Sequence, residues 1–286
     1  MMLPVERIQS GGLHRRRGYA SFVPLRPNAA MARRLIRIVQ YAALPVFLLL
    51  FWEEAVHFSW VPRALIAGPS TVLVRFAEMI GDGTLFQHVG VSLSRLGAGY
   101  LIGTVSGVLL GVLVGFRPLA ARSVEPTVLL LIPVPPIAWI PLLIILLGIG
   151  ESSKIALISI GSFCTLFLQA AYGIRTGDKS LVEMSHALNK SDRALLWRVL
   201  FPGALPGILA SMRIALALSW TLLLASEVIA SSSGLGWLIW DSRNFSRAND
   251  MFVGMVTVGV LGKLTDSALV LLEARLTKWR RAFRDQ

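Results

Sequence analysis

Long apolar segments alternate with shorter polar ones along the chain. A helix that crosses a bilayer needs about 20 mostly apolar residues. Windows of that length fall at roughly 35–52, 89–115, 124–149, 153–174, 204–230 and 251–273. The pattern predicts an all-α integral membrane protein with six transmembrane helices, and an even number of spans puts both chain ends on one side of the membrane.

A polar segment between the first two windows predicts a different kind of helix. From Ser70 to Ile80 apolar residues recur at helical spacing, and Gly81-Asp82-Gly83 ends the run. We expect a short amphipathic helix here, lying on the outer face against the interface or the bundle.

The second window is rich in small residues. Glycines recur every four residues along nearly one helix face, which lets another backbone approach closely. The face predicts either a contact with another subunit or, as is commoner in membrane bundles, packing within the chain. Its members are Gly99, Gly103, Gly107, Gly111 and Gly115.

The third window is interrupted by prolines, which remove backbone donors and clash with the preceding turn, so we expect a break or kink within 132–141. Broken backbone at membrane depth is tolerated where protein or a water-filled cavity satisfies its polar groups. The segment is a candidate lining or hinge of a pathway, or else a kink that only fits the bundle. Its prolines are Pro133, Pro135, Pro136 and Pro141.

A polar, helix-forming segment from Glu183 to Pro202 separates the fourth and fifth windows. Ser180 and Glu183 have the spacing of a capping box, in which the serine caps a helix and the glutamate reaches back. Asn189 tolerates a positive φ, and Ser191 can cap a second helix that ends near Pro202. We expect a helix-turn-helix whose surface is available to a partner, the alternative being a solvated loop helix.

Basic residues indicate the membrane topology. Lys and Arg gather in 1–34, 116–123, 175–202 and the C-terminal tail, and they are few in the loops on the other side. The positive-inside rule then places both termini and the segment 175–202 in the cytoplasm. The net charge of +12 is therefore a topology signal, and it requires no nucleic-acid partner.

Composition supports a membrane location and argues against several chemistries. Hydrophobic residues make up 55% of the 286 residues and charged ones 15%, which is more apolar surface than a water-soluble fold can bury. A single cysteine, Cys164, leaves no disulfide framework or thiol metal cluster. The four histidines fall outside the windows, so neither a metal site nor an intramembrane metalloenzyme is expected.

Of the ionisable residues inside the predicted spans we single out three, because an unpaired charge at mid-bilayer costs about 3 kcal/mol or more. Arg213 and Lys263 are candidates for contact with an anion, and Glu227 is a candidate for an outer gate with residues 231–236. The alternatives are a Lys263–Asp266 pair one turn apart, a snorkelling Arg213, and Glu227 as the cap or anchor of a re-entrant turn.

The polar segment resembles the cytoplasmic signature of the transmembrane subunits of binding-protein-dependent ABC importers, which reads EAA, three residues, G, nine residues, I, one residue, LP. Here Glu183-Met184-Ser185 stands for EAA, Asn189 for the glycine and Val199-Leu200-Phe201-Pro202 for IxLP; the spacing is fully kept, while only Glu183 and Pro202 are identical. Further segments, such as LIPVPPIAWIPLLIILLGIGESSKIALI, are similar to the nitrate, sulfonate and taurine branch, and the resemblance covers roughly 60–280.

The resemblance implies a permease that pairs with a second copy, two cytoplasmic ABC ATPase subunits and an extracytoplasmic solute-binding protein, in a bacterial cytoplasmic (inner) membrane. Its parts would be a mobile basic tail 1–34, a first span with the outer amphipathic segment 35–84, a permease core 85–276 with coupling helices 180–202, and a tail 277–286. The residues implied to couple to the ATPase are Glu183, Ala187, Asn189, Ser191 and Pro202.

ATP is expected to bind to the partner subunits. The chain has no GxxxxGK phosphate-binding sequence, the nearest being Gly259-Val260-Leu261-Gly262-Lys263, so we expect no cofactor and no enzyme activity in this chain. The alternative function is a self-sufficient ion-coupled secondary carrier that uses Arg213, Glu227 and Lys263. The polar segment favours the permease subunit, because a carrier needs no ATPase groove.

The sequence leaves open which solute is transported, which Met is the natural start and which permease pairs with this chain. The resemblance implies a small anion such as a sulfonate, taurine or nitrate. Residues 1–30 do not read as a cleaved signal peptide, and Met31, which opens MARRLIRIVQ, is a second candidate for the natural start. Pairing with a second copy of this chain is the expectation, and pairing with a different permease is the alternative.

Overall fold

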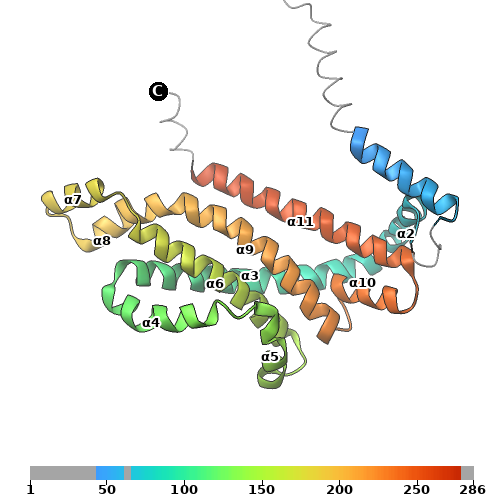
Figure 1. Cartoon of the computed structure of the whole chain (residues 1–286), viewed down its shortest axis with the longest axis horizontal. Helices are drawn as coiled ribbons and strands as arrows, with labels where there is room; N and C mark the ends of the chain where they lie inside the picture. Colours follow the sequence, from blue (N-terminus) through green and yellow to red (C-terminus); the bar gives the residue numbers. More distant parts are fainter. Residues whose placement is uncertain (1–42, 61–65, 278–286) are drawn as a thin grey trace, which may run out of the picture. The chain divides into compact units, whose positions relative to one another are not determined.

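The computed structural model describes residues 43–60 and 66–277, and within these ranges every regular element is a helix (Figure 1). The chain divides into two units, one ending at Phe51 and one beginning at Trp52. Residues 43–57 are helical and fall at this division. The start of the first predicted span, the tail 1–34 and nearly all of the tail 277–286 lie outside the described residues.

In the second unit every described regular element is a helix. This confirms the all-α prediction for the described residues. In chain order the helices are α2 (Pro69–Gly81), α3 (Thr84–Phe116), α4 (Pro118–Leu131), the 3-10 helix η1 (Pro136–Trp139), α5 (Ile140–Leu147), α6 (Glu151–Arg175), α7 (Lys179–Ala187), α8 (Asp192–Leu195), the π-helical turn η2 (Leu196–Leu200), α9 (Phe201–Ala230), α10 (Leu235–Asn244) and α11 (Ala248–Leu276).

Four helical stretches among the described residues are long and apolar enough to cross a membrane. They are Thr84–Phe116, Glu151–Arg175, Asp192–Ala230 and Ala248–Leu276. Counting the bent pair Pro118–Leu131 and Pro136–Leu147 as one span brings the number to five. The predicted windows at 89–115, 153–174, 204–230 and 251–273 each fall inside one of the four long helices.

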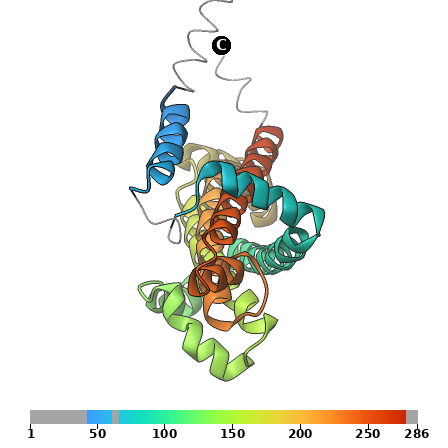
Figure 2. The ribbon, with the colours of Figure 1, turned by 90° about the vertical axis from the view of Figure 1, so that its right-hand side faces the viewer.

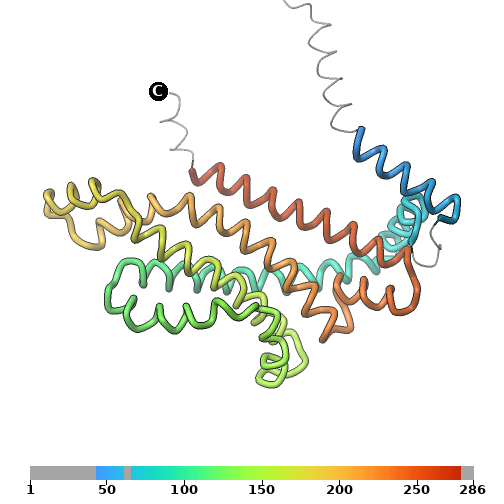
Figure 3. Tube along the Cα trace, viewed as in Figure 1, coloured from blue at the N-terminus to red at the C-terminus, as the bar shows by residue number. Residues whose placement is uncertain are grey.

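The centre of the unit is formed by α3, α6 and α9, which pack along one another (Figures 1 and 3). The glycine face of α3 is turned toward the α6 backbone. A Cβ placed on Gly107 would lie 2.7 Å from the carbonyl oxygen of Phe163 and 3.2 Å from the amide nitrogen of Phe167. The predicted close-packing helix is confirmed, and its partner is α6 of the same chain.

The remaining helices cover this core from different sides. In Figures 1 and 2, α11 (red) lies on one side of the core and the α4–α5 segment (green) on the other. Helix α2 packs against α11 and α3, burying Val72 and Met79 while Leu73 stays exposed. The Arg75 guanidinium joins α2 to α11 by an ion pair with Asp250, 2.6 Å from Nε to Oδ1. The predicted amphipathic helix is therefore present.

The chain turns sharply after α4. Pro126 is accommodated inside α4, whereas Pro133 and Pro135 lie after its end and Pro136 and Pro141 fall in the first turns of η1 and α5, where a missing N–H has no helical partner to lose. The two halves are bent by 89°, and the sharp turn between them can be followed in Figure 3. This geometry fits both a broken span and a re-entrant loop.

Filling the α3–α6 contact should destabilise the protein. In Gly107→Ala the new methyl group meets backbone atoms that cannot rotate away, so we expect a loss of about 1–3 kcal/mol, the usual cost of overpacking. Gly97→Ala is the matched control, because a Cβ at Gly97 has nothing within 4 Å. Thermal unfolding of the detergent-solubilised protein measures both; equal melting temperatures for the two variants would contradict the packing argument.

Candidate functional site

The helix α7 is capped differently from the prediction. Its N-cap is Asp178, whose Oδ1 accepts a hydrogen bond from the Ser180 N–H at 2.9 Å. An aspartate at this position satisfies a free backbone donor and places negative charge at the helix N-terminus. The predicted capping box of Ser180 and Glu183 is therefore wrong, because the helix begins earlier, with Asp178 as the N-cap and Ser180 inside the first turn.

The turn between α7 and α8 follows the prediction at both of its marked residues. Asn189 has a φ of 48°, the left-handed conformation that asparagine tolerates. Ser191 is the N-cap of α8, and its Oγ accepts from the Ala194 N–H at 3.4 Å. Both roles are local and structural.

The predicted end of the second helix near Pro202 is wrong. Helix α8 continues through the π-helical turn into α9, so one helical stretch runs from Asp192 to Ala230. In that turn the Phe201 N–H donates to the Leu196 carbonyl, one residue further back than in an α-helix. The wider turn shifts the hydrogen-bond register just before Pro202, which has no N–H to donate.

The exposed face of α7 is partly apolar. Leu181, Met184 and Leu188 recur at helical spacing and are exposed, beside the exposed Glu183 and Ala187, whereas Ser185 faces the protein and is buried. A large exposed apolar surface on a polar helix is typical of an interaction site. These residues lie at the end of the bundle away from α10 (Figure 1).

Ion pairs join this end of the bundle to the core. The Arg175 guanidinium on α6 binds the Glu125 carboxylate on α4 through two hydrogen bonds, of 2.7 and 2.5 Å. Arg117, between α3 and α4, lies 3.3 Å from the Asp192 carboxylate at the start of α8. The second pair is exposed and adds little stability, so the first is the firmer link.

The membrane-depth charges Arg213 and Lys263 share one carboxylate. Arg213 donates to Asp266 from Nε at 2.7 Å and from Nη2 at 3.2 Å, and the Lys263 ammonium lies 3.6 Å from Asp266. The predicted Lys263–Asp266 pair is thus present, and Arg213 joins it from α9. All three side chains are partly or largely exposed near the middle of α9 and α11.

Glu227, unlike Arg213 and Lys263, is fully buried, with an exposed fraction of 0%. Its Oε1 accepts from the Ser92 hydroxyl at 2.7 Å and from Arg95 Nη1 at 2.9 Å, and its Oε2 accepts from the Gly236 N–H at 2.8 Å. Gly234, with a φ of 113°, brings the backbone so close that a Cβ there would overlap this carboxylate. Glu227 therefore anchors the turn between α9 and α10 to α3.

Arg95 extends this network to a second carboxylate. Its Nε and Nη2 bind the two oxygens of Glu151 at 2.5 and 2.6 Å, and the Lys154 ammonium lies 3.2 Å from Glu151 Oε1. Sequence reasoning missed this centre, although Arg95 lies inside a predicted span and Lys154 at the edge of another. The rule that selected Arg213 applies to Arg95 equally.

The proline-rich segment lies next to this network. A small cavity beside Lys154 is lined by Ile140 and Leu143 of α5, Leu157 of α6 and Ser226 of α9. The segment from Pro133 to Pro141 therefore leads into a helix that borders the buried charges. Within the described residues, no group of three His, Cys, Asp or Glu side chains is placed to hold a metal ion.

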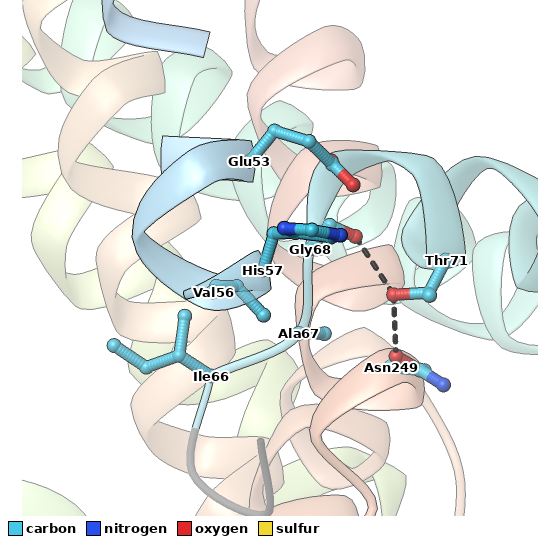
Figure 4. A pocket seen from close by; sticks show the side chains of 8 residues that line it. All are labelled: Glu53, Val56, His57, Ile66, Ala67, Gly68, Thr71 and Asn249. Atoms are coloured by element: carbon cyan, nitrogen blue, oxygen red, sulfur yellow. Dashed lines mark hydrogen bonds between the residues drawn. The ribbon is translucent and has the colours of Figure 1, made fainter. Parts of the chain in front are cut away.

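A pocket of about 390 Å³ lies between residues 53–57 and the start of α2, within the second unit (Figure 4). Glu53 accepts hydrogen bonds there from the Ser70 N–H at 2.9 Å and the Ser70 hydroxyl at 2.6 Å. Thr71 donates to the Gly68 carbonyl and lies 3.1 Å from Asn249 Oδ1. Because the N-cap Gly68 has no side chain, Glu53 supplies the missing cap of α2 from another helix.

These elements define a class of protein: a multi-pass α-helical membrane protein with a polar helix pair at one end of its core and buried charges at the other. The chain belongs to the family of the binding-protein-dependent transport system inner membrane component, whose family model matches residues 104–278. This confirms the resemblance inferred from the signature in the sequence.

Curated relatives fall in the predicted branch. The chain is 36% identical over 240 residues to SsuC of Bacillus subtilis (strain 168), described as an aliphatic sulfonates transport permease protein, a match that covers 84% of this chain and 87% of SsuC. It is 32% identical over 241 residues to the taurine transport system permease protein TauC of Escherichia coli (strain K12), covering 82% and 87%. To the nitrate import permease protein NrtB of Leptolyngbya laminosa it is 28% identical over 199 residues, covering 68% and 71%.

A solved structure shares the fold. A chain of the MetNI methionine ABC transporter, in an inward-facing conformation, superposes with a TM-score of 0.58 at 23% identity. The match covers 68% of this chain and 96% of that one.

The Glu53 cap should make stability depend on acid pH. The Ser70 hydroxyl and N–H hold the pKa of Glu53 below its usual value, so the cap contributes fully above the unfolded-chain pKa of about 4.3. The contribution is lost as the pH falls through the lowered pKa. We expect the difference in melting temperature between wild type and Glu53→Gln to become smaller as the pH is lowered from 7 to about 3, as measured by thermal unfolding.

The exposed neighbour Glu54 supplies the control for this experiment. The difference in melting temperature between wild type and Glu54→Gln should not change with pH in this way. A Glu53→Gln difference that is the same at every pH would exclude the capping role.

Proposed function

We propose that this chain is the transmembrane permease subunit of an ATP-driven ABC importer, forming the solute path and coupling it to separate ATPase subunits. The observation that carries the proposal is the exposed apolar face of α7, Leu181, Met184 and Leu188, on the segment that keeps the spacing of the family signature. Family membership and the sulfonate, taurine and nitrate permeases among the relatives support it.

The α7–α8 pair acts as the coupling segment in this proposal. Glu183, Met184 and Ala187 lie on the face of α7 that is open to a partner, whereas Asn189, Ser191 and Pro202 set the turn and the join to α9. Because α8 runs without a break into α9, a displacement of the pair is carried directly into a membrane-spanning helix. ATPase closure would then change which side of the permease is open.

The topology proposed is six spans with both termini in the cytoplasm. The predicted span at 35–52 and the bent pair α4–α5 are the two spans that complete the four long helices. The positive-inside rule supports a cytoplasmic α7–α8 pair and an extracytoplasmic α2 and α10. A bacterial inner membrane is the setting that the names of the family and its bacterial relatives support.

The exposed cluster of Arg213, Lys263 and Asp266 supports pairing with a second permease copy. These charges lie near the middle of α9 and α11, and charges at that depth face protein or water and not lipid. We infer that this face of α9 and α11 borders the solute path between two copies. The prolines from Pro133 to Pro141 lead into α5 on the other side of the core, and we infer that they act as a hinge near the outer end of the permease.

A small anion, of the sulfonate, taurine or nitrate kind, is the proposed solute. An extracytoplasmic binding protein would deliver it, and ATP would bind and be hydrolysed in the partner subunits, with no cofactor in this chain. A binding assay on that separate binding protein identifies the solute directly.

Changing the α7 face should uncouple transport from ATP hydrolysis. In Met184→Asp the apolar contact is replaced by a charge that must be desolvated, and Glu183→Arg reverses the charge beside it. We expect uptake and solute-stimulated ATPase activity to fall at least about tenfold in both, the scale of losing a well-packed interface contact. Reconstituted complexes measure both activities.

The control is Met184→Leu, which keeps the apolar face and should retain both activities. Unchanged uptake and stimulation in Glu183→Arg and Met184→Asp would remove this face from the coupling mechanism.

The alternative of an ion-coupled carrier is tested with the chain alone. We expect the purified chain, in vesicles with an ion gradient and no ATP, to take up no methanesulfonate, taurine or nitrate. Addition of ABC ATPase subunits, the binding protein and ATP should restore uptake. Gradient-driven uptake by the chain alone would favour the carrier instead.

A further inference from the structure

The two carboxylates of the buried network differ in exposure. Arg95 and Lys154 are 3% and 4% exposed, and Glu227 is fully buried, but the Glu151 side chain is 58% exposed. Glu227 is fixed by Ser92, Arg95 and the Gly236 N–H, whereas the described partners of Glu151 are the two cations alone. Glu151 is therefore the member of the network that is most open to solvent and the one held only by the two cations.

The two edges of the Arg95 guanidinium bind different groups. Nη1 is bound to Glu227 at 2.9 Å and to the Ser233 carbonyl at 2.8 Å, which fixes the plane of the guanidinium. The Nε–Nη2 edge faces Glu151 with two parallel hydrogen bonds. This edge has the geometry that recognises the paired oxygens of a carboxylate, nitrate or sulfonate.

Lys154 and the start of α6 add to the attraction for an anion at this point. Within the described residues Glu151 is the one acidic partner of Lys154, so its departure leaves a buried ammonium without a counter-ion. The N-cap Gly150 offers no side chain to the first N–H groups of α6, which also favour negative charge. The four charges balance as they stand, and without Glu151 the site carries one net positive charge.

We propose that the oxyanion group of the transported solute binds to the Nε–Nη2 edge of Arg95 and the ammonium of Lys154, in the place that Glu151 occupies when no solute is present. This inference rests on the proposed function, an importer of small anions. In the proposed topology the site lies at the outer end of the path, where the binding protein delivers the solute. Glu151 acts as an internal competitor that keeps the site neutral between transport cycles.

The test measures anion binding to the permease–ATPase complex without the binding protein, whose own affinity would mask the site. Melting temperatures are followed as methanesulfonate or nitrate replaces chloride at constant ionic strength, with the neutral dimethyl sulfone as control. We expect Glu151→Gln to lower the half-saturating anion concentration, and Lys154→Gln to raise it, each on the order of tenfold, the scale of one charge-assisted hydrogen bond.

Two further variants separate the site from general effects of charge and folding. Arg122→Gln removes an exposed cation on α4 and should leave the titration unchanged. Arg95→Lys keeps a positive charge beside the buried Glu227 but loses the bidentate edge, so it should fold and bind the anion more weakly. Removing the charge at Arg95 is avoided, because an unpaired buried carboxylate costs several kcal/mol.

The outcomes distinguish this inference from the proposed function. If the wild-type complex takes up sulfonate or nitrate with ATP, but Glu151→Gln and Lys154→Gln titrate like wild type, the anion site is wrong and the importer stands. Equal stabilisation by dimethyl sulfone, or no stabilisation by either anion, also overturns the site. If the wild-type complex neither binds an ATPase nor transports, the proposed function fails independently.

Discussion

The contact between α3 and α6 sets the register of the whole core. Glycines every four residues on α3 meet the α6 backbone in parallel: Gly99 meets Ile155, Gly107 meets Phe163 and Gly115 meets Ala171, each pair 56 residues apart. Arg95 and Glu151 are 56 residues apart as well. The ion pair of Arg95 and Glu151 thus continues the same register by one helical turn, and it forms because the two backbones run so close together along their length.

The two ends of the core differ in the side chains that they carry. At one end the helices finish in charged groups that Glu227 and Arg95 hold together, with Gly234 turned so that α10 folds back onto the network. At the other end α6 leads into the α7–α8 pair, which presents apolar side chains to the outside. The α3–α6 pair connects the two ends and is rigid, since backbone in direct contact has little freedom to deform.

The prolines act mainly where helices begin or end. Pro136 and Pro141 fall in the first turns of η1 and α5, where their missing N–H groups have no helical partner, and the sharp bend lies before them. Pro202 is carried within a continuous helix because the preceding π turn adjusts the hydrogen-bond pattern. A proline count alone therefore locates irregular backbone but does not distinguish a break from a helix start.

Local composition and spacing were enough to predict the helical membrane class, the positions of the long helices, the close-packing face of α3 and the turn at Asn189. The family signature in the segment from Glu183 to Pro202 could also be read from the chain. The packing of the helices was needed to show that α6 is the partner of the glycines and that Asp266 joins Arg213 to Lys263. It likewise brought Arg95, Glu151 and Glu227 together from three helices, since contacts between residues far apart in the chain depend on how helices pack and leave no periodic trace in any one segment.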